Sequence, residues 1–367
     1  MPGKTITIYD TTLRDGSQTV GISLSIQDKL NIAKILDWLK VDYIEGGWPG
    51  SNPKDDSFFN EIRKNEIKHA KIAAFGSTRR KGFKCKDDPM LQSLVASKAD
   101  VITLVAKTWD FQVTKALGME LAENLELIYD SVAYLKDLGF EVFLDAEHFF
   151  DGNKANRDYS FECIEKASEA GTDMIVLCDT NGGTLPAEVY NITSAVTSRI
   201  KTPVGGHFHN DTGVAVANSM FALDAGAISI QGTVNGYGER CGNCDLMTLI
   251  PNAVLKMGYK CPSGEALQHL TEVSRLVSEI ANLHHVENLP YVGDNAFAHK
   301  GGIHVSALQK DTRTYEHVDP LLVGNRRKVM ISELSGKSNI EFKAKELGIN
   351  IDGELSITKP LLDKIKK

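Results

Sequence analysis

The sequence predicts a (β/α)8 TIM barrel, an α/β fold, followed by a small, mainly helical C-terminal subdomain. Eight short runs rich in β-branched residues alternate with segments whose apolar residues recur at helical spacing. Such alternation is typical of a parallel sheet, and eight units within roughly 250 residues match this barrel. A doubly wound open sheet is the main alternative. It would have fewer strands and a glycine-rich phosphate loop after the first one, whereas the first run is followed by Thr11–Gly16, TTLRDG.

Turn residues separate the predicted strands from the helices between them. The segment after the first strand shows the helical pattern at Leu30, Ala33 and Leu36. Gly139 and Gly171 end the helices that precede the fifth and sixth strands. In chain order the predicted strands are Thr5–Asp10, Val41–Glu45, Lys71–Phe75, Asp100–Val105, Glu141–Asp145, Asp173–Cys178, Pro203–His209 and Ala227–Val234.

The pattern changes after about residue 260. We expect a helix around Glu265–Ala281, a loop-rich stretch over Tyr291–Gly324, and one or two short helices over 325–367. The sequence therefore predicts a catalytic barrel over residues 1–262, with a linker helix and a small C-terminal subdomain over 263–367.

Composition excludes several classes of protein. Apolar residues make up 42% and charged residues 24%, with a formal net charge of −7, which excludes intrinsic disorder. The scattered Lys and Arg residues argue against nucleic-acid binding. No apolar run reaches the length of about 18 residues needed to span a membrane, and Met1–Thr5 is not the start of a signal peptide. Six cysteines fit reduced thiols, so we expect a cytoplasmic protein.

Polar and ionisable residues follow six of the predicted strands. In a TIM barrel the active site lies at the carboxyl ends of the strands. Because these residues would share that face, the pattern predicts an active site there. They are Asp10 with Arg14 and Asp15, Glu45–Trp48, Asp145–His148, Asp179–Asn181, His207–Asp211 and Asn235–Asn243.

The sharpest pattern within this set is His207-x-His209. Residues i and i+2 of a strand point to the same side, so two imidazoles would converge on one point and could chelate a divalent cation. Asp15, at an adjacent strand end, offers a carboxylate, and the side-chain carbonyl of Asn243 could join the metal shell. Nitrogen and oxygen ligands suit Zn²⁺, Mn²⁺ or Mg²⁺. A pair of structural histidines is the alternative.

Three further features each allow two interpretations. Arg14 beside Asp15 would suit a substrate carboxylate or a carbonyl oxygen that becomes negative, or it would pair with Asp10 at the surface. Thr180 would donate hydrogen bonds to a carboxylate, or the loop that it opens would cap the next helix. Cys241–Cys244 forms a CxxC pattern that could be a redox pair, although two thiols packed near the loop explain it as well.

Three motifs together resemble the DRE-type metal-dependent TIM-barrel acyltransferases, the isopropylmalate, homocitrate and citramalate synthases. They are DTTLRDG at Asp10–Gly16, HFHND at His207–Asp211 and GERCGN at Gly238–Asn243. The resemblance runs from residue 4 to about residue 340. It implies a Claisen-type condensation in which acetyl-CoA, the co-substrate, loses an α-proton. The enolate attacks the ketone of an α-keto acid, and hydrolysis of the thioester releases CoA.

The resemblance also implies a role for individual residues. The metal ligands of the family match Asp15, His207, His209 and Asn243. The arginine that steadies the developing alkoxide matches Arg14. A cation and a guanidinium that polarise the same carbonyl would stabilise the charge that grows in the transition state.

The remaining implied roles concern the keto-acid carboxylate and the catalytic base. The threonine that holds the carboxylate matches Thr180. The histidine thought to act as the base matches His304, with a barrel glutamate matching Glu147 and a tyrosine matching Tyr315. His299 is an alternative base five positions earlier. His304 lies some 70 residues beyond the eighth predicted strand, so we expect a homodimer in which it completes the partner's site.

The branch of the family is indicated by two segments, Glu45–Asp55 and Asp145–Gly152, which look most like the citramalate synthases. This similarity implies pyruvate as the acceptor and (R)-citramalate as the product, on the route to isoleucine. A 2-isopropylmalate synthase that uses 2-oxoisovalerate for leucine biosynthesis is the alternative. Leu104 and the pair Phe149–Phe150 would help to close the pocket against larger acceptors.

Three rival functions fit the sequence less well. A lyase of the 3-hydroxy-3-methylglutaryl-CoA type would carry a reactive cysteine in a glycine-rich loop, whereas Gly236–Cys241 follows the synthase pattern. A biotin-dependent carboxyltransferase would need a lysine at the ends of strands four to six, and we expect none there. A non-catalytic sensor would not explain Arg14, Glu147 and His304 together. The family usually continues into a C-terminal regulatory domain, whereas this chain stops at Lys367, so it is either a piece of a longer protein or naturally unregulated, and we expect no feedback inhibition by isoleucine or leucine for this chain.

Overall fold

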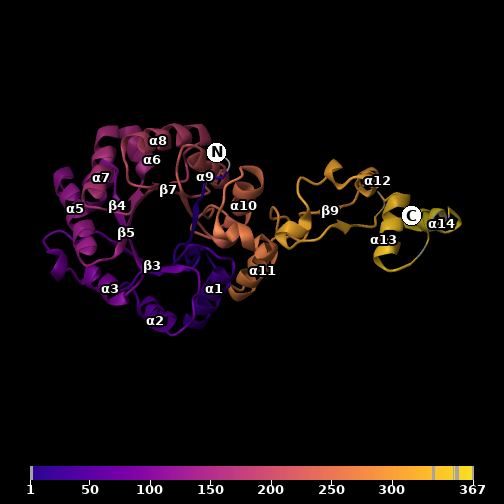
Figure 1. Ribbon diagram of the computed structural model, residues 1–367, viewed down its shortest axis with the longest axis horizontal. Helices are drawn as coiled ribbons and strands as arrows, with labels where there is room; N and C mark the ends of the chain where they lie inside the picture. Colours follow the sequence, from indigo (N-terminus) through magenta and orange to yellow (C-terminus); the bar gives the residue numbers. More distant parts are fainter. Residues whose placement is uncertain (1–2, 333–334, 350, 352–354, 366–367) are drawn as a thin grey trace. The chain divides into compact units, whose positions relative to one another are not determined.

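A computed structural model describes residues 3–332, 335–349, 351 and 355–365. Within this described part, eight parallel strands close into a barrel in sequential order, and the last strand pairs with the first (Figure 1). The predicted fold class is therefore confirmed. The strands are β1 (Thr7–Asp10), β2 (Tyr43–Gly47), β3 (Lys71–Ser77), β4 (Val101–Lys107), β5 (Glu141–Glu147), β6 (Met174–Asp179), β7 (Val204–Phe208) and β8 (Ser229–Gly232).

Helices surround the barrel on its outside (Figure 1). Helix α1 shows why they form: Ser25 and Asp28 make a reciprocal capping box at its start, and the apolar side of the helix is buried. The helices of this layer are α1 (Ile26–Trp38), α2 (Pro53–Ile62), α3 (Pro89–Ser97), the single turn α4 (Asp110–Gln112), α5 (Leu121–Asp137), α6 (Phe149–Ala155), α7 (Arg157–Glu169), α8 (Pro186–Arg199), α9 (Ala215–Asp224), α10 (Leu246–Pro251) and α11 (Leu270–Ile280).

The interior of the barrel is packed with side chains. Tyr9, Val101, Phe143 and Met174 belong to one buried cluster that fills it. The Tyr9 hydroxyl lies 2.8 Å from the Thr103 hydroxyl inside this cluster. Because the interior is filled, substrates can bind only at the rim where the strands end.

Strands β2 to β6 each end later in the chain than the sequence predicted, and the difference matters most for β4 and β5. Strand β4 ends at Lys107 and not at Val105, and β5 ends at Glu147 and not at Asp145. The seven residues of β4 pair in unbroken register with the seven of β5, and this pairing carries both strands to the rim. The expectation that strands four to six end without a lysine is therefore wrong.

The chain forms two compact units. The first comprises Met1–Ala266 and Val273–His284, and the second comprises Leu267–Glu272 and His285–Lys367. Helix α11 begins at Leu270, after a 3-10 segment over Pro262–His269, and so starts later than predicted. The second unit contains β9 (Ala298–His299), α12 (Gly302–Lys310), β10 (Lys328–Val329), α13 (Lys337–Glu346) and α14 (Leu355–Ile365).

The stretch Tyr291–Gly324 is more ordered than the sequence indicated. Helix α12 occupies nine residues of it, and β9 pairs in parallel with β10. His304 therefore lies on a helix and not on a loop. The last described part of the chain holds α13 and α14, in line with the short helices expected there.

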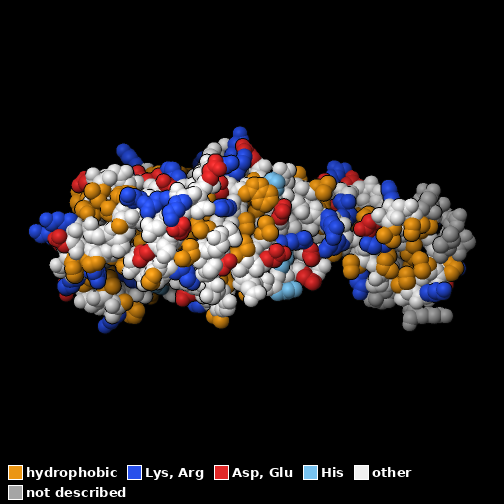
Figure 2. Space-filling view, turned by 90° about the horizontal axis from the view of Figure 1, so that it is seen from below, with side chains coloured by type: hydrophobic (Ala, Val, Ile, Leu, Met, Phe, Trp, Pro, Cys, Tyr) orange, Lys and Arg blue, Asp and Glu red, His pale blue; other side chains and the backbone are white. Residues whose placement is uncertain are grey.

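Acidic and basic side chains are interspersed over the surface drawn in Figure 2. This mixed distribution agrees with the scattered charges of the sequence. Among the residues that the structure describes, no helix is both long and apolar enough to cross a membrane.

Candidate active site

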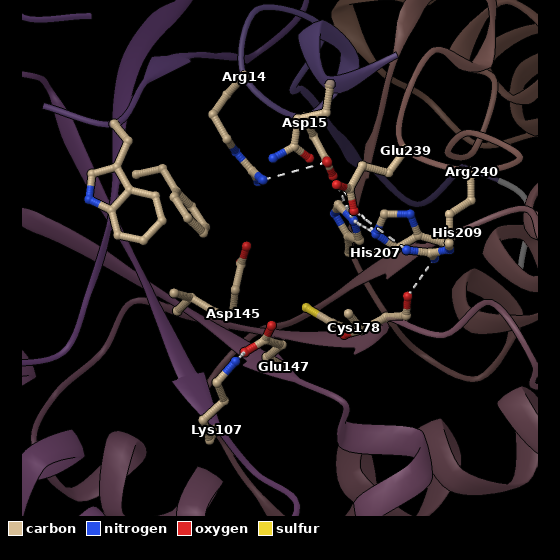
Figure 3. A pocket seen from close by; sticks show the side chains of 15 residues that line it. Arg14, Asp15, Lys107, Asp145, Glu147, Cys178, His207, His209, Glu239 and Arg240 are labelled. Carbon is tan, nitrogen blue, oxygen red and sulfur yellow. Dashed lines mark hydrogen bonds and ion pairs between the residues drawn. The ribbon is translucent and has the colours of Figure 1, made fainter. Parts of the chain in front are cut away.

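A pocket of about 290 Å³ opens at the carboxyl ends of the barrel strands. Six of the nine residues that the sequence assigned to the site line this pocket, and Figure 3 shows how the labelled ones point into it. Asn243 lies beside the pocket residue His209, while His304 and Tyr315 belong to the second unit. The six residues are Arg14, Asp15, Glu147, Thr180, His207 and His209.

Asp15, His207 and His209 form a buried group that could hold a metal ion. The Nε2 atom of His207 lies 3.2 Å from Asp15 Oδ2 and 3.2 Å from His209 Nε2. His209 Nε2 lies 3.9 Å from the same carboxylate oxygen. The ligand atoms of all three residues fall within 4.8 Å of one another, as the HxH spacing predicted.

The electrostatics of Asp15 and His209 suit a cation, whereas the Asp15 carboxylate outweighs burial and raises the pKa of His207. Burial alone would raise the pKa of Asp15, but the Arg14 guanidinium and His207 outweigh burial and hold that pKa well below its ordinary value. Burial, reinforced by the charge of His207, lowers the pKa of His209 to about 3. An ionised carboxylate and a neutral imidazole are the forms in which these side chains bind a metal.

Gln231 on β8 fixes the orientation of the His207 ring. Its Nε2 donates to Asp145 Oδ1 at 2.9 Å, and its Oε1 lies 2.8 Å from His207 Nδ1. Since an amide oxygen can only accept, His207 Nδ1 carries the proton and donates it to Gln231. The Nε2 atom of His207 is thereby turned toward Asp15 and His209. Such an outer partner is typical of a metal-ligating histidine.

Asn243 offers a further ligand atom. Its Oδ1 is buried and has no hydrogen-bond partner among the described residues, while its Nδ2 donates to Tyr237 O at 3.1 Å. The backbone of Asn243 pairs with that of His209 in a β-bridge. A Cβ at Gly238 would lie 2.2 Å from the Asn243 amide nitrogen, so only glycine leaves room for that side chain. An unpaired buried carbonyl beside His209 fits the role of a metal ligand.

Arg14 is held by an ion pair with Glu45 and by stacking on the ring of Phe75. Its Nε donates to Glu45 Oε2 at 2.6 Å, and its guanidinium lies 3.9 Å from the centre of the Phe75 ring. Asp15 Oδ1 lies 3.6 Å from Arg14 Nη1. The alternative partner Asp10 is wrong, because that carboxylate accepts from the backbone N–H and the hydroxyl of Thr12 instead.

Thr180 presents a hydroxyl proton to the pocket. The Oγ1 atom of Thr180 accepts a hydrogen bond of 2.9 Å from the backbone N–H of His148. Because that contact uses a lone pair, the hydroxyl hydrogen stays available to donate to a carboxylate. The backbone oxygen of Thr180 accepts from Arg240 Nη2 at 2.8 Å, which holds the loop in place.

Lys107 is a charged pocket residue that the sequence did not identify. It forms an ion pair with Glu147, and both side chains lie across the pocket from Arg14 and Asp15 (Figure 3). Asp145 stands two residues before Glu147, and burial together with the charge of Glu45 raises the pKa of Asp145 to about 7. The signal that could have revealed Lys107 is the period-2 alternation of β4 carried two residues further.

The side chains expected to close the pocket lie elsewhere. Leu104, Phe149 and Phe150 are all fully buried, and none of them lines the pocket. Phe150 packs against Phe208, with ring centres 5.6 Å apart. In β4, Leu104 lies between the inward-facing Thr103 and Val105, so it points outward. The apolar part of the pocket comes instead from Trp48, Phe75 and Val105.

The two cysteines of the CxxC pattern are not bonded to each other. Cys241 is an exposed free thiol, and Cys244 is a buried free thiol. Burial raises the pKa of Cys244 to about 12, which keeps it protonated and unreactive. The structure thus places a glycine-rich turn around Asn243 here, with no disulfide.

The second unit brings His304 and Tyr315 together. Their rings stack with centres 4.1 Å apart, and both side chains are exposed. His299 has different surroundings, because its Nε2 lies 3.3 Å from Glu316 Oε1 and Glu316 also pairs with Arg327. His299 is therefore tied into an ion-pair network, whereas His304 is exposed.

The barrel and this site together define a family of enzymes. Residues 5–277 match the family model described as HMGL-like, and residues 291–367 match the model described as homocitrate synthase post-HMGL domain-like. The first model covers well over half of the chain. The chain therefore belongs to the HMGL-like family of metal-dependent barrel enzymes, and the predicted family is confirmed.

Within that family the chain groups with the (R)-citramalate synthases. The (R)-citramalate synthase of Aquifex aeolicus is 52% identical over 361 residues, which cover 98% of this chain and 68% of the relative. That of Sulfolobus acidocaldarius is 52% identical over 365 residues, covering 99% of this chain and 70% of the relative. The predicted class of enzyme, an acyltransferase of the citramalate synthase type, is confirmed.

Solved structures agree on the fold. An HMG-CoA lyase from Bacillus subtilis superimposes with a TM-score of 0.64 over 77% of this chain and 96% of the lyase. At 18% identity this likeness concerns the barrel architecture alone.

Proposed function

We propose that this chain condenses acetyl-CoA with pyruvate to give (R)-citramalate and CoA, as a cytoplasmic step toward isoleucine. The observation that carries the proposal is the buried group Asp15, His207 and His209 beside Arg14, in one pocket of a chain that groups with the (R)-citramalate synthases. A cation and a guanidinium on the same side of a pocket suit a ketone whose oxygen becomes negative.

A divalent cation, Zn²⁺, Mn²⁺ or Mg²⁺, would be held by Asp15, His207, His209 and Asn243. The orphaned oxygen of Asn243 and the orientation of His207 toward Asp15 support this ligand set. When bound, the cation would polarise the ketone as a Lewis acid. Arg14 donates to the alkoxide oxygen from the neighbouring position.

The keto-acid carboxylate would accept a hydrogen bond from the hydroxyl group of Thr180 in the same pocket. The small volume of the pocket and its walls of Trp48, Phe75 and Val105 favour a methyl ketone such as pyruvate over branched acceptors. One extra methylene costs only about 1–3 kcal/mol of discrimination, so these walls would set a preference rather than an absolute exclusion.

The base that removes the α-proton of acetyl-CoA would be His304, with Tyr315 stacked against it and Glu147 in the pocket. His304 is preferred to His299 because His299 is held by Glu316. We place His304 in the site of a second chain, in a homodimer. Hydrophobic side chains gather on the second unit in Figure 2, and Ile303 and Leu321 are 82% and 72% exposed, which supports burial against a partner.

The test is release of CoA from acetyl-CoA, followed with a thiol reagent over a panel of pyruvate, 2-oxoisovalerate and 2-oxoglutarate. We expect the highest kcat/KM with pyruvate, and citramalate as the product by NMR. A higher kcat/KM with 2-oxoisovalerate would make the chain a 2-isopropylmalate synthase. Cleavage of 3-hydroxy-3-methylglutaryl-CoA would make it a lyase, and binding without turnover would make it a sensor.

A further inference from the structure

Lys107 and Glu147 end neighbouring strands and lie directly opposite each other in the register of β4 and β5. Two residues earlier, Val105 and Asp145 form the equivalent pair. Alternate residues of a strand point to the same side, and the inward side is known because Thr103 contacts Tyr9 inside the barrel. Both side chains therefore point into the pocket, where they form an ion pair (Figure 3).

The backbone at this point is held rigidly. The backbone N–H and the hydroxyl of Thr108 both donate to the carbonyl oxygen of Glu147, at 3.2 and 2.8 Å. Asn124 Nδ2 donates to the carbonyl oxygen of Lys107 at 2.9 Å. Because Lys107 and Glu147 lie at the ends of two strands whose backbone is fixed, their side chains keep one position. Sites built on regular secondary structure are precise for the same reason.

Three other acidic side chains share the pocket with Glu147. Asp145 lies on the same face of β5, and Asp15 and Glu239 line the same pocket. On β6, burial and then the charges of Asp145 and Glu147 raise the pKa of the Cys178 thiol, so Cys178 stays neutral. The cations among the described pocket residues are otherwise committed: Arg14 pairs with Glu45 and Asp15, and Arg240 pairs with Asp211 and Glu239, beside His207 and His209.

We propose that Lys107 is a positioning residue whose ammonium group stabilises the Glu147 carboxylate and keeps it directed across the pocket. The inference rests on the proposed function, in which Glu147 acts with His304 on the α-proton of acetyl-CoA. Without Lys107, the Glu147 carboxylate would lose its counter-charge, and its side chain would lose the contact that fixes its rotamer.

Two other roles for Lys107 make different predictions. A lysine that binds the keto-acid carboxylate directly would raise KM for the keto acid and leave kcat unchanged when it is replaced. A purely structural lysine would lower the melting temperature without moving the pH profile. A positioning lysine acts through Glu147, so its loss lowers kcat, moves the acid limb of the profile and adds nothing once Glu147 is replaced.

The experiment compares Lys107→Met, Lys107→Arg, Glu147→Gln and the double variant Lys107→Met/Glu147→Gln. Lys71→Met is the matched control, because Lys71 pairs with Glu141 at the opposite end of β5 and is 52% exposed. For each variant kcat and both KM values are measured between pH 5.5 and 9 with acetyl-CoA and pyruvate, together with the melting temperature.

We expect Lys107→Met to lose about 10²-fold in kcat near neutral pH, a typical contribution of an acid–base group. Its acid limb should move to higher pH by at least about half a unit, and Lys107→Arg should recover most of the activity. The double variant should match Glu147→Gln, and Lys71→Met should match the wild type. A rise in the KM of pyruvate alone, or losses that multiply in the double variant, would overturn the proposal.

A second readout separates this inference from the proposed function. If the wild type releases no CoA with any keto acid, the function fails, and the pair is examined by titrating protein labelled with ¹³C at the glutamate carboxyls. The Glu147 signal is assigned by its absence in Glu147→Gln. A titration midpoint that is higher in Lys107→Met than in the wild type supports the inference, and an unchanged midpoint refutes it.

Discussion

Arg14 and Glu45 form a buried ion pair at the base of the pocket. The Glu45 carboxylate is fully buried and accepts from the Arg14 Nε at 2.6 Å and from the Tyr9 hydroxyl at 2.8 Å. Thr11 donates to the same carboxylate. Since the Phe75 ring covers one face of the guanidinium, Arg14 keeps a single orientation, with its remaining N–H groups directed toward the pocket.

Replacing Glu45 by Gln should therefore disable the site and weaken the fold. Loss of one partner of a buried pair costs about 3–5 kcal/mol in the free energy of unfolding. We expect kcat/KM to fall by about 10²-fold or more, because the transition-state charge loses a fixed donor. Asp130→Asn is the control: Asp130 pairs with Arg79 at 2.7 Å but is 46% exposed, so its loss should cost less than about 1 kcal/mol. Equal effects of both variants on stability would contradict the assignment.

Gln231 should strengthen metal binding although it is not one of the proposed metal ligands. Gln231→Leu removes the acceptor of the His207 Nδ1 proton, and loss of such a partner typically weakens metal binding by about 10- to 100-fold. The affinity is measured by titrating Mn²⁺ or Zn²⁺ against a competing chelator. Gln92→Leu is a control, because Gln92 bonds Tyr134 on the outer helices. Unchanged affinity in Gln231→Leu would show that the His207 ring needs no such support.

The proposed metal requirement has a direct test. A chelated sample should lose turnover and regain it with Mn²⁺, Mg²⁺ or Zn²⁺. His207→Ala should bind less metal and should not be restored by the same additions, because one of the converging ligand atoms is gone. Full turnover by a metal-free His207→Ala protein would exclude the proposed site.

The proposed homodimer predicts that two inactive variants rescue each other. His304→Ala and Asp15→Ala are each expected to be inactive alone. If His304 serves the partner's site, a mixed dimer carries one site with both lesions and one with neither. At statistical exchange about half of the dimers are mixed, so recovery should approach about a quarter of wild-type turnover per chain. Proven exchange with no recovery would place His304 in the site of its own chain or outside catalysis.

Asp10 should make stability depend on pH. Burial raises the pKa of Asp10 to about 7, whereas an unfolded chain titrates this group near about 3.9. Between these values the folded protein binds a proton that the unfolded chain releases. The contribution to stability is therefore full below about pH 4 and is lost as pH rises toward 7, by at most about 1.4 kcal/mol per unit.

Asp10→Asn should flatten this dependence, because the amide is neutral at every pH and still accepts from the Thr12 N–H. The measurement is urea denaturation at pH 5, 6, 7 and 8, followed by circular dichroism. The exposed Asp137→Asn is the control and should keep the wild-type slope. Identical slopes in all three proteins would show that Asp10 is ionised in the folded state.

The local pattern of the amino-acid sequence determined the secondary structure of this protein, its fold class and part of its candidate site. Alternating strands and helices are set by periodicity along the chain, and eight such units without a glycine-rich phosphate loop after the first strand favour a barrel over an open sheet. The carboxyl ends of parallel strands then share one rim, which is why Asp15, His207 and Thr180 could be expected in one place. The convergence of His207 and His209 needed only the two-residue repeat of a strand.

Tertiary structure decided which charges meet. Arg14 pairs with Glu45, 31 residues away, and not with its neighbour Asp10; Lys107 pairs with Glu147, 40 residues away. These partners depend on the register between strands and on how far each strand extends before it ends. Register is fixed when whole strands pair and the barrel closes, so spacing within one segment carries no information about it.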